Sequence, residues 1–213
     1  MSTYRLHCRS RSGNSYKVAF YLSAAGLPWE PVLVTPADNQ SAAWRQGVNA
    51  MGEIPVLEAD GRFLSQSGAI LIELARKTGH FAPADETQWS EALRWILWDN
   101  HKFTNHWATY RFVKSFSPKE PAPGVLDYLK AHSDQNFAVL DRTLAGSPYV
   151  LGDTPSIVDF SLAGYVYYPD SEWGYGWRDG HPHIAAWADR LAALPGWKGP
   201  YEMMPGGIAK PVR

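Results

Sequence analysis

The sequence predicts an α/β domain followed by an all-helical domain, and three observations lead to this prediction. Over about the first 80 residues, short strand-like segments alternate with amphipathic helical segments. A stretch containing proline and alanine at 81–85 is typical of a linker. Beyond it, apolar side chains recur only at helical spacing. We therefore assign residues 1–79 to the first domain, 80–86 to the linker and 87–213 to an all-helical C-terminal domain.

The first half of the first domain is expected to form a β-α-β-α unit. Residues 4–8 alternate in polarity and predict the first strand. Residues 15–25 carry an apolar helix face, and Gly26 is a suitable residue to end that helix. A second strand is expected at 31–34, followed by a short irregular helix over 37–46.

The second half of this domain is expected to form a hairpin and a helix. Asp60-Gly61 is a preferred dipeptide for a two-residue turn, and it joins short strands at 56–57 and 62–64. The next helix is expected to end near Gly79, with apolar side chains at Ile70, Leu71, Leu74 and Ala75. The whole order, β-α-β-α-β-β-α, is the thioredoxin-like arrangement.

The C-terminal domain is expected to contain amphipathic helices over 87–113, 125–144, 156–168 and 183–194. Ser156 and Asp159 have the spacing of a capping box at the start of the third of these helices. The tail from Gly196 onward is rich in proline and glycine, so we expect it to be extended on the surface or disordered.

Composition excludes several classes of function. The formal net charge is −1, which predicts no nucleic-acid partner and no anionic membrane partner. The single cysteine cannot form an intramolecular disulfide, and no apolar run approaches the roughly 20 residues of a membrane span. The N-terminus shows no signal-peptide pattern, and the seven histidines show no metal-binding spacing. We therefore expect a cytoplasmic protein without a metal.

Two short motifs predict a site for a small peptide. Ile54-Pro55 precedes a strand, and a cis bond there would turn the Ile54 backbone groups away from the sheet. Those groups could then pair with an extended peptide, as an added strand would. At Gln66-Ser67, a serine hydroxyl and the first N–H groups of a helix would form a site for a carboxylate.

These motifs resemble the glutathione-binding half of the glutathione transferase family, which has an apolar residue before a cis-proline and a Glu/Gln-Ser pair. Residues 149–159 resemble the C-terminal domain of the same family. The resemblance implies glutathione as co-substrate and a homodimer. Asn49-Ala50 replaces the usual Asn-Pro of the family, and we expect this change to loosen the turn. The implied glutathione-binding residues are Gln40, Glu53, Ile54, Pro55, Gln66 and Ser67.

The loop after the first strand is expected to hold the glutathione sulfur. It resembles the loop of the serine-type bacterial, zeta and nu-like transferases, with Ser12 at the Ser/Thr position and Asn14 two residues later. Ser12 is the first candidate for the catalytic donor to the sulfur, and the Asn14 amide is the second. The alternative is that both residues only cap the following helix. Cys8 lies at the end of the strand, where a buried structural role is expected.

The electrophile is expected to bind between the domains, among aromatic and basic residues of the helical domain. Most aromatic side chains there could instead belong to the core. The expected reaction is conjugation of glutathione to a hydrophobic or aromatic electrophile. The alternatives are a glutathione-dependent isomerase, a disulfide or peroxide reductase, or a non-catalytic binding protein. The candidate pocket residues are Trp98, Lys102, Trp107, Arg111 and Tyr165.

Overall fold

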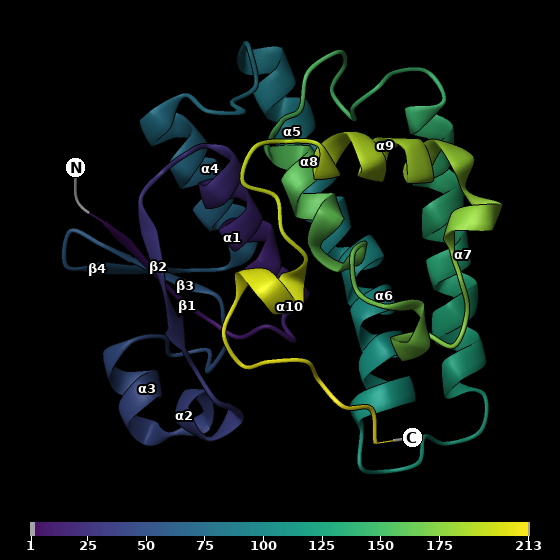
Figure 1. Ribbon diagram of the computed structural model, residues 1–213, viewed down its shortest axis with the longest axis horizontal. Coiled ribbons are helices and arrows are strands. Elements are labelled where there is room, and N and C mark those ends of the chain that lie inside the picture. The colour runs from purple at the N-terminus through teal and green to yellow at the C-terminus, as the bar shows by residue number, and fades with distance from the viewer. Residues whose placement is uncertain (1–2, 213) are drawn as a thin grey trace. The chain divides into compact units, whose positions relative to one another are not determined.

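The computed structural model describes residues 3–212, which form two compact units (Figure 1). The first unit joins the chain up to Ala82 to the segment Leu194–Ala209. The second unit contains Pro83–Ala193 together with the chain from Lys210 onward. Residues 194–209, which the sequence analysis placed in the helical domain, thus belong to the first unit by their contacts.

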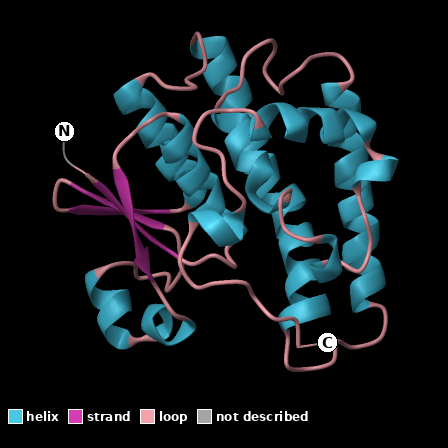
Figure 2. Cartoon of the chain, viewed as in Figure 1, coloured by secondary structure: helices cyan, strands magenta, loops and turns pink. Residues whose placement is uncertain are grey.

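A four-stranded mixed sheet forms the centre of the first unit (Figure 2). Its order is β2-β1-β3-β4, with β1 parallel to β2 and antiparallel to β3, as the thioredoxin-like prediction requires. Asp60 and Gly61 have φ of +51° and +73°, so the hairpin turn has the two left-handed residues that the dipeptide predicts. The strands are β1 (Tyr4–Cys8), β2 (Trp29–Leu33), β3 (Val56–Ala59) and β4 (Arg62–Ser65).

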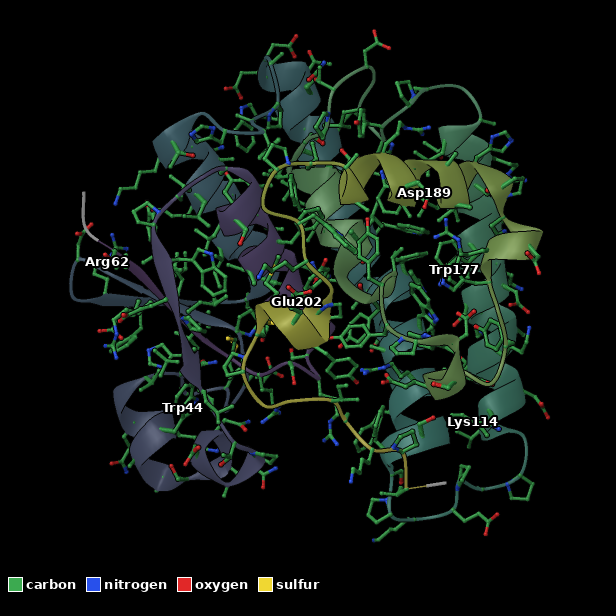
Figure 3. All side chains as sticks on the ribbon, in the orientation of Figure 1. Trp44, Arg62, Lys114, Trp177, Asp189 and Glu202 are labelled. Atoms are coloured by element: carbon green, nitrogen blue, oxygen red, sulfur yellow. The ribbon has the colours of Figure 1, made fainter. Side chains whose placement is uncertain are left out.

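Helices cover both faces of this sheet. Helices α1 (Gly13–Ala24) and α4 (Ser67–Thr78) lie on one face, and the short helices α2 (Pro36–Gln40) and α3 (Ala42–Gly47) lie on the other (Figure 1). Trp44 of α3, labelled in Figure 3, is buried in a cluster with Val56 of the sheet. Each face therefore has its own apolar core.

The C-terminal tail of the first unit is neither disordered nor merely extended. It contains the short helix α10 (Pro200–Met203), and both Met203 and Met204 are buried. The Tyr16 hydroxyl of α1 donates a hydrogen bond to the Lys198 carbonyl at 2.9 Å. The tail is tied to the rest of the unit by its apolar side chains and by such backbone contacts.

The second unit is helical, as predicted. One long helix was expected over 87–113; the structure instead has α5 (Glu86–Trp98) and α6 (Thr104–Arg111), joined by a π-helical turn at Asp99–Phe103. A second π-helical turn follows at Phe112–Phe116. The remaining α-helices of the described part of this unit are α7 (Val125–Leu144), α8 (Ile157–Leu162) and α9 (Pro182–Ala192).

The predicted capping box at the start of α8 is confirmed. The Ser156 hydroxyl and the Asp159 carboxylate each accept a hydrogen bond from the backbone of the helix start. The buried Asp159 carboxylate also accepts from the Val150 N–H at 3.0 Å and from the Trp187 indole N–H at 2.9 Å. Across residues 3–212, no helix is both long enough and apolar enough to span a bilayer.

Candidate functional site

Three loops meet at one end of the sheet in the first unit, which we call the loop end. Val56, at the start of β3, pairs with both His7 of β1 and Ser65 of β4. The loop after Cys8, the segment that precedes Val56 and the junction that follows Ser65 therefore emerge side by side. Sequence reasoning had assigned a binding role to all three segments.

Helix α1 begins at the loop end, two residues earlier than its apolar pattern predicts. Ser12 is the N-cap, with extended φ and ψ, and its hydroxyl oxygen accepts a hydrogen bond from the Ser15 N–H at 3.2 Å. A serine oxygen that accepts one bond still has a hydroxyl hydrogen to donate. Ser12 can therefore cap the helix and donate to a ligand at the same time, so the two interpretations of this residue are compatible.

Asn14 lies on the first turn of α1 and is half-buried. Its Oδ1 atom is buried and has no hydrogen-bond partner within residues 3–212. Because the oxygen and nitrogen of an amide are assigned from their partners, either end of the amide could occupy this position. The side chain thus has unused hydrogen-bonding capacity at the helix start, as a ligand-binding amide requires.

The peptide bond between Ile54 and Pro55 is cis, as the sequence analysis predicted. The preceding turn is held by hydrogen bonds of Asn49, and the loosening of this turn by Ala50 remains a prediction. The buried Asn49 side chain donates to the Glu53 carbonyl at 3.0 Å and accepts from the Met51 N–H at 3.1 Å. These two bonds hold the turn that leads into Ile54.

A second buried asparagine holds the same turn from α2. The Asn39 amide donates to the Gly52 carbonyl, and its Oδ1 accepts from the Arg9 guanidinium at 3.1 Å. Sequence reasoning missed Asn39 as a positioning residue, and the only signal for it was an asparagine within a short polar helix. Gln40, the neighbouring residue, is exposed at the end of α2, next to this turn.

The junction between β4 and α4 leaves a helix start without a side-chain cap. Gln66 is the N-cap residue, with φ of +69°, and its side chain makes no capping hydrogen bond. Its amide instead donates to the Glu53 carboxylate at 3.0 Å. The sequence analysis expected a hydroxyl cap at Ser67, whereas Ser67 is the first helical residue and is buried. The first N–H groups of α4 are therefore available to an anionic ligand.

The comparison with known families decides the identity. Residues 6–80 match the sequence model of the glutathione S-transferase N-terminal domain, and residues 129–190 match that of the C-terminal domain. The chain belongs to the glutathione S-transferase family. Together these matches include both the loop end and the capped helix α8.

Several relatives of this transferase-family chain span nearly its whole length. Protein LigF of Sphingobium is 26% identical over 94% of this chain and 93% of its own. Glutathione S-transferase GstB of Escherichia coli is 27% identical over 88% and 92%, respectively. The disulfide-bond oxidoreductase YfcG of the same species is 25% identical over 85% and 87%.

Solved transferase structures have the same fold. A glutathione S-transferase from Pseudomonas fluorescens superposes with a TM-score of 0.83 at 29% identity, covering 93% of this chain and 99% of its own. A glutathione transferase from Burkholderia graminis, with two glutathione molecules bound per subunit, has a TM-score of 0.79 at 27% identity, covering 91% and 85%. Within residues 3–212, no group of His, Cys, Asp or Glu could hold a metal ion.

Cys8 cannot supply a nucleophile in this transferase-family chain. Its side chain is fully buried, and burial raises the pKa of the thiol to about 12. A thiol with such a pKa is almost entirely protonated near neutral pH. The structural role that the sequence analysis expected for Cys8 is confirmed.

In the second unit, three of the five residues proposed for the electrophile pocket have structural partners instead. Arg111 forms a buried ion pair with Glu172, to which its Nε atom donates at 2.6 Å. Trp107 is buried against Phe137 and other aromatic rings, and Tyr165 is also buried. These three side chains stabilise the helical core. Trp98 is half-buried and Lys102 is exposed, so these two retain the surface that a ligand needs.

Proposed function

We propose that this protein conjugates the thiolate of glutathione to a hydrophobic or aromatic electrophile. The observation that carries the proposal is the meeting of three segments at the loop end: the start of α1 at Ser12, the cis bond at Ile54-Pro55 and the uncapped start of α4. Each offers a group that one part of a small thiol tripeptide requires.

Each part of glutathione has a proposed partner in this arrangement. The extended middle of the tripeptide pairs with the Ile54 backbone, beside Pro55. One carboxylate lies at the start of α4, bound by N–H groups and by Ser67, with Gln66 and Glu53 beside it. Gln40 contacts the other end from α2. In this pose the sulfur lies beside Ser12 and Asn14.

Ser12 would act by stabilising the thiolate. A free thiol has a pKa of about 8.5, so little thiolate exists near neutral pH. A donated hydroxyl hydrogen and the positive end of α1 both favour the anion. The sulfur then attacks an electrophilic carbon, the carbon–sulfur bond forms, and the leaving group departs with its electron pair. Binding both reactants also removes their translational and rotational freedom before the chemical step, which lowers the entropic barrier to their reaction.

We also propose a homodimer, a cytoplasmic location and a role in detoxification, as family membership suggests.

The Ser12→Ala variant tests the proposal. We expect kcat for conjugation to fall at least about tenfold, because one charge-assisted hydrogen bond to the thiolate is lost, while KM for glutathione changes little. Ser41→Ala is a matched control, since Ser41 caps α3 in the same way, by accepting from the Trp44 N–H at 3.1 Å. Full activity of Ser12→Ala would mean that Asn14 or the helix end stabilises the sulfur.

A reductase is the second candidate function, and two findings favour it. A relative of similar length is a disulfide-bond oxidoreductase, and the Burkholderia structure holds two glutathione molecules per subunit. Assays of an aryl halide, an organic hydroperoxide and a mixed disulfide, side by side with glutathione, would separate the two reactions. Glutathione binding without turnover of any of the three would instead indicate a non-catalytic binding protein.

A further inference from the structure

A cavity of about 420 Å³ lies at the end of the sheet opposite the loop end. Its lining comes from the start of β1, the end of β3 and the end of α4, so it lies within the first unit. Along β1, roughly 13 Å of strand separates Tyr4 on this lining from Cys8, after which the loop end begins. The volume is within the range of small-molecule sites. The cavity is therefore a candidate site distinct from the proposed glutathione site.

Hydrogen bonds to the backbone hold the walls of this cavity. The Tyr4 N–H donates to the Pro28 carbonyl at 3.0 Å, which fixes the turn between α1 and β2. The Tyr21 hydroxyl donates to the His80 carbonyl at 2.8 Å, and the His80 N–H donates to the Thr78 hydroxyl oxygen at 3.3 Å. These bonds fix the segment that follows α4. The cavity is thus preformed, as small-molecule sites commonly are.

Most of the cavity lining is apolar. Leu27 and Pro28 contribute from the turn after α1, and Ala59 contributes from the end of β3. Two charged side chains also line the cavity, and they form an ion pair in which Lys77 Nζ lies 3.0 Å from Asp60 Oδ2. A charged ligand would have to compete with this pair. The lining therefore suits a molecule with an apolar body and no net charge.

Tyr4 supplies a polar group without a partner. Its side chain lines the cavity and the residue is only 9% exposed, yet its hydroxyl has no hydrogen-bond partner among the described residues. The hydroxyls of Tyr16 and Tyr21, in contrast, both donate to backbone carbonyls. A tyrosine hydroxyl usually has a partner when the residue is buried. The Tyr4 O–H is therefore suited to donate to an acceptor atom of a ligand.

We propose that this cavity binds a neutral aromatic molecule that carries a carbonyl oxygen, at a site separate from that of glutathione. The aromatic body contacts Leu27, Pro28 and Ala59, and the carbonyl oxygen accepts a hydrogen bond from the Tyr4 hydroxyl. This inference goes beyond the proposed conjugation, because it requires no group of the loop end and no reaction of the bound molecule.

Two naphthalenes of similar shape provide the test. 2-Acetylnaphthalene has the carbonyl oxygen, and 2-ethylnaphthalene lacks it. Equilibrium dialysis gives the Kd of each for the wild-type protein and for Tyr4→Phe, which retains the ring and removes the hydroxyl. We expect Tyr4→Phe to weaken the ketone about fivefold and to change the hydrocarbon less than about twofold, because only the ketone loses a hydrogen bond.

Two further variants locate the site. Ala59→Leu fills part of the cavity, so we expect it to weaken both naphthalenes at least about tenfold and to leave glutathione affinity within about twofold. Tyr128→Phe removes a hydroxyl from an exposed tyrosine of α7 and is the matched control, for which we expect no change. In the nuclear magnetic resonance spectrum of the wild-type protein, the ketone should shift the amide signals of Ala59 and His80 and not that of Ser12.

Four results would overturn the proposal. Equal weakening of the ketone and the hydrocarbon by Tyr4→Phe would show that the hydroxyl makes no bond to the ligand. Unchanged signals of Ala59 and His80 in the wild-type protein would show that the ketone does not enter the cavity. Tighter binding of 2-naphthoate than of the ketone would indicate a site for anions. Competition between the ketone and glutathione would contradict a separate site.

Discussion

The buried polar residues of the first unit and those of the second unit have opposite consequences for ligand binding. At the loop end, Asn39 and Asn49 use their side chains to satisfy the turn that leads into Ile54. Their hydrogen bonds fix the backbone before Ile54, and this fixed backbone remains accessible to a ligand. In the second unit, the Asp159 carboxylate accepts hydrogen bonds from neighbouring groups such as the Trp187 indole N–H, and Arg111 donates to Glu172.

This difference explains which candidate residues we still propose for the binding site. A buried charge that is already paired is costly to separate, so Arg111 is poorly suited to bind a substrate carboxylate. A neutral amide, in contrast, can fix a binding loop through hydrogen bonds to its backbone and adds no charge that would attract or repel the ligand. Burial alone therefore does not distinguish a binding site from a core; the partners of the buried groups do.

The largest expected effect is on the core network of the second unit. Asp159→Ala leaves the buried N–H groups of Val150 and Trp187 without an acceptor, so we expect the free energy of unfolding to fall by at least about 3 kcal/mol. Urea denaturation followed by tryptophan fluorescence measures the change. Asp153→Ala, at an exposed position, is the control, and we expect a change within about 0.5 kcal/mol. An equal response of the two variants would show that the network adds no stability.

An intermediate effect is expected at the loop end, on ligand affinity more than on stability. Asn49→Ala removes both bonds that hold the turn before Ile54, and we expect the Kd for glutathione to rise about tenfold. Asn49→Asp keeps the acceptor for the Met51 N–H and loses the donor to Glu53, so its effect should be smaller. Calorimetry measures both. Unchanged affinity in Asn49→Ala would contradict the positioning role of this residue.

The smallest expected effect is at Cys8. Because burial raises the pKa of its thiol to about 12, the native protein should resist alkylation by iodoacetamide between pH 7 and about pH 9, where an exposed thiol with a pKa of about 8.5 becomes reactive. Mass spectrometry of the native and the urea-denatured protein measures the difference. Cys8→Ala should retain conjugation activity. Rapid labelling of the native protein would contradict the assignment of Cys8 to the core.

Much of this arrangement follows from local sequence patterns. Alternation and turn chemistry predict β1 and the hairpin at Asp60-Gly61, whereas the cis bond at Pro55 was implied by the resemblance to the family. The role of Asn49 did not follow, because side-chain bonds to nearby backbone depend on a turn geometry that sequence spacing does not specify. The pairing of Arg111 with Glu172 joins residues 61 positions apart, which local periodicity cannot detect. The attachment of the tail to the first unit is long-range for the same reason.

The most direct test of the central claim is the pKa of the glutathione thiol when it is bound to this protein. Ultraviolet difference absorbance of the thiolate, titrated against pH, gives this value for the wild-type protein and for Ser12→Ala. The account predicts a bound pKa clearly below the value of about 8.5 for a free thiol in the wild-type protein, and a return toward that value in Ser12→Ala. A bound pKa equal to that of free glutathione in the wild-type protein would contradict the account.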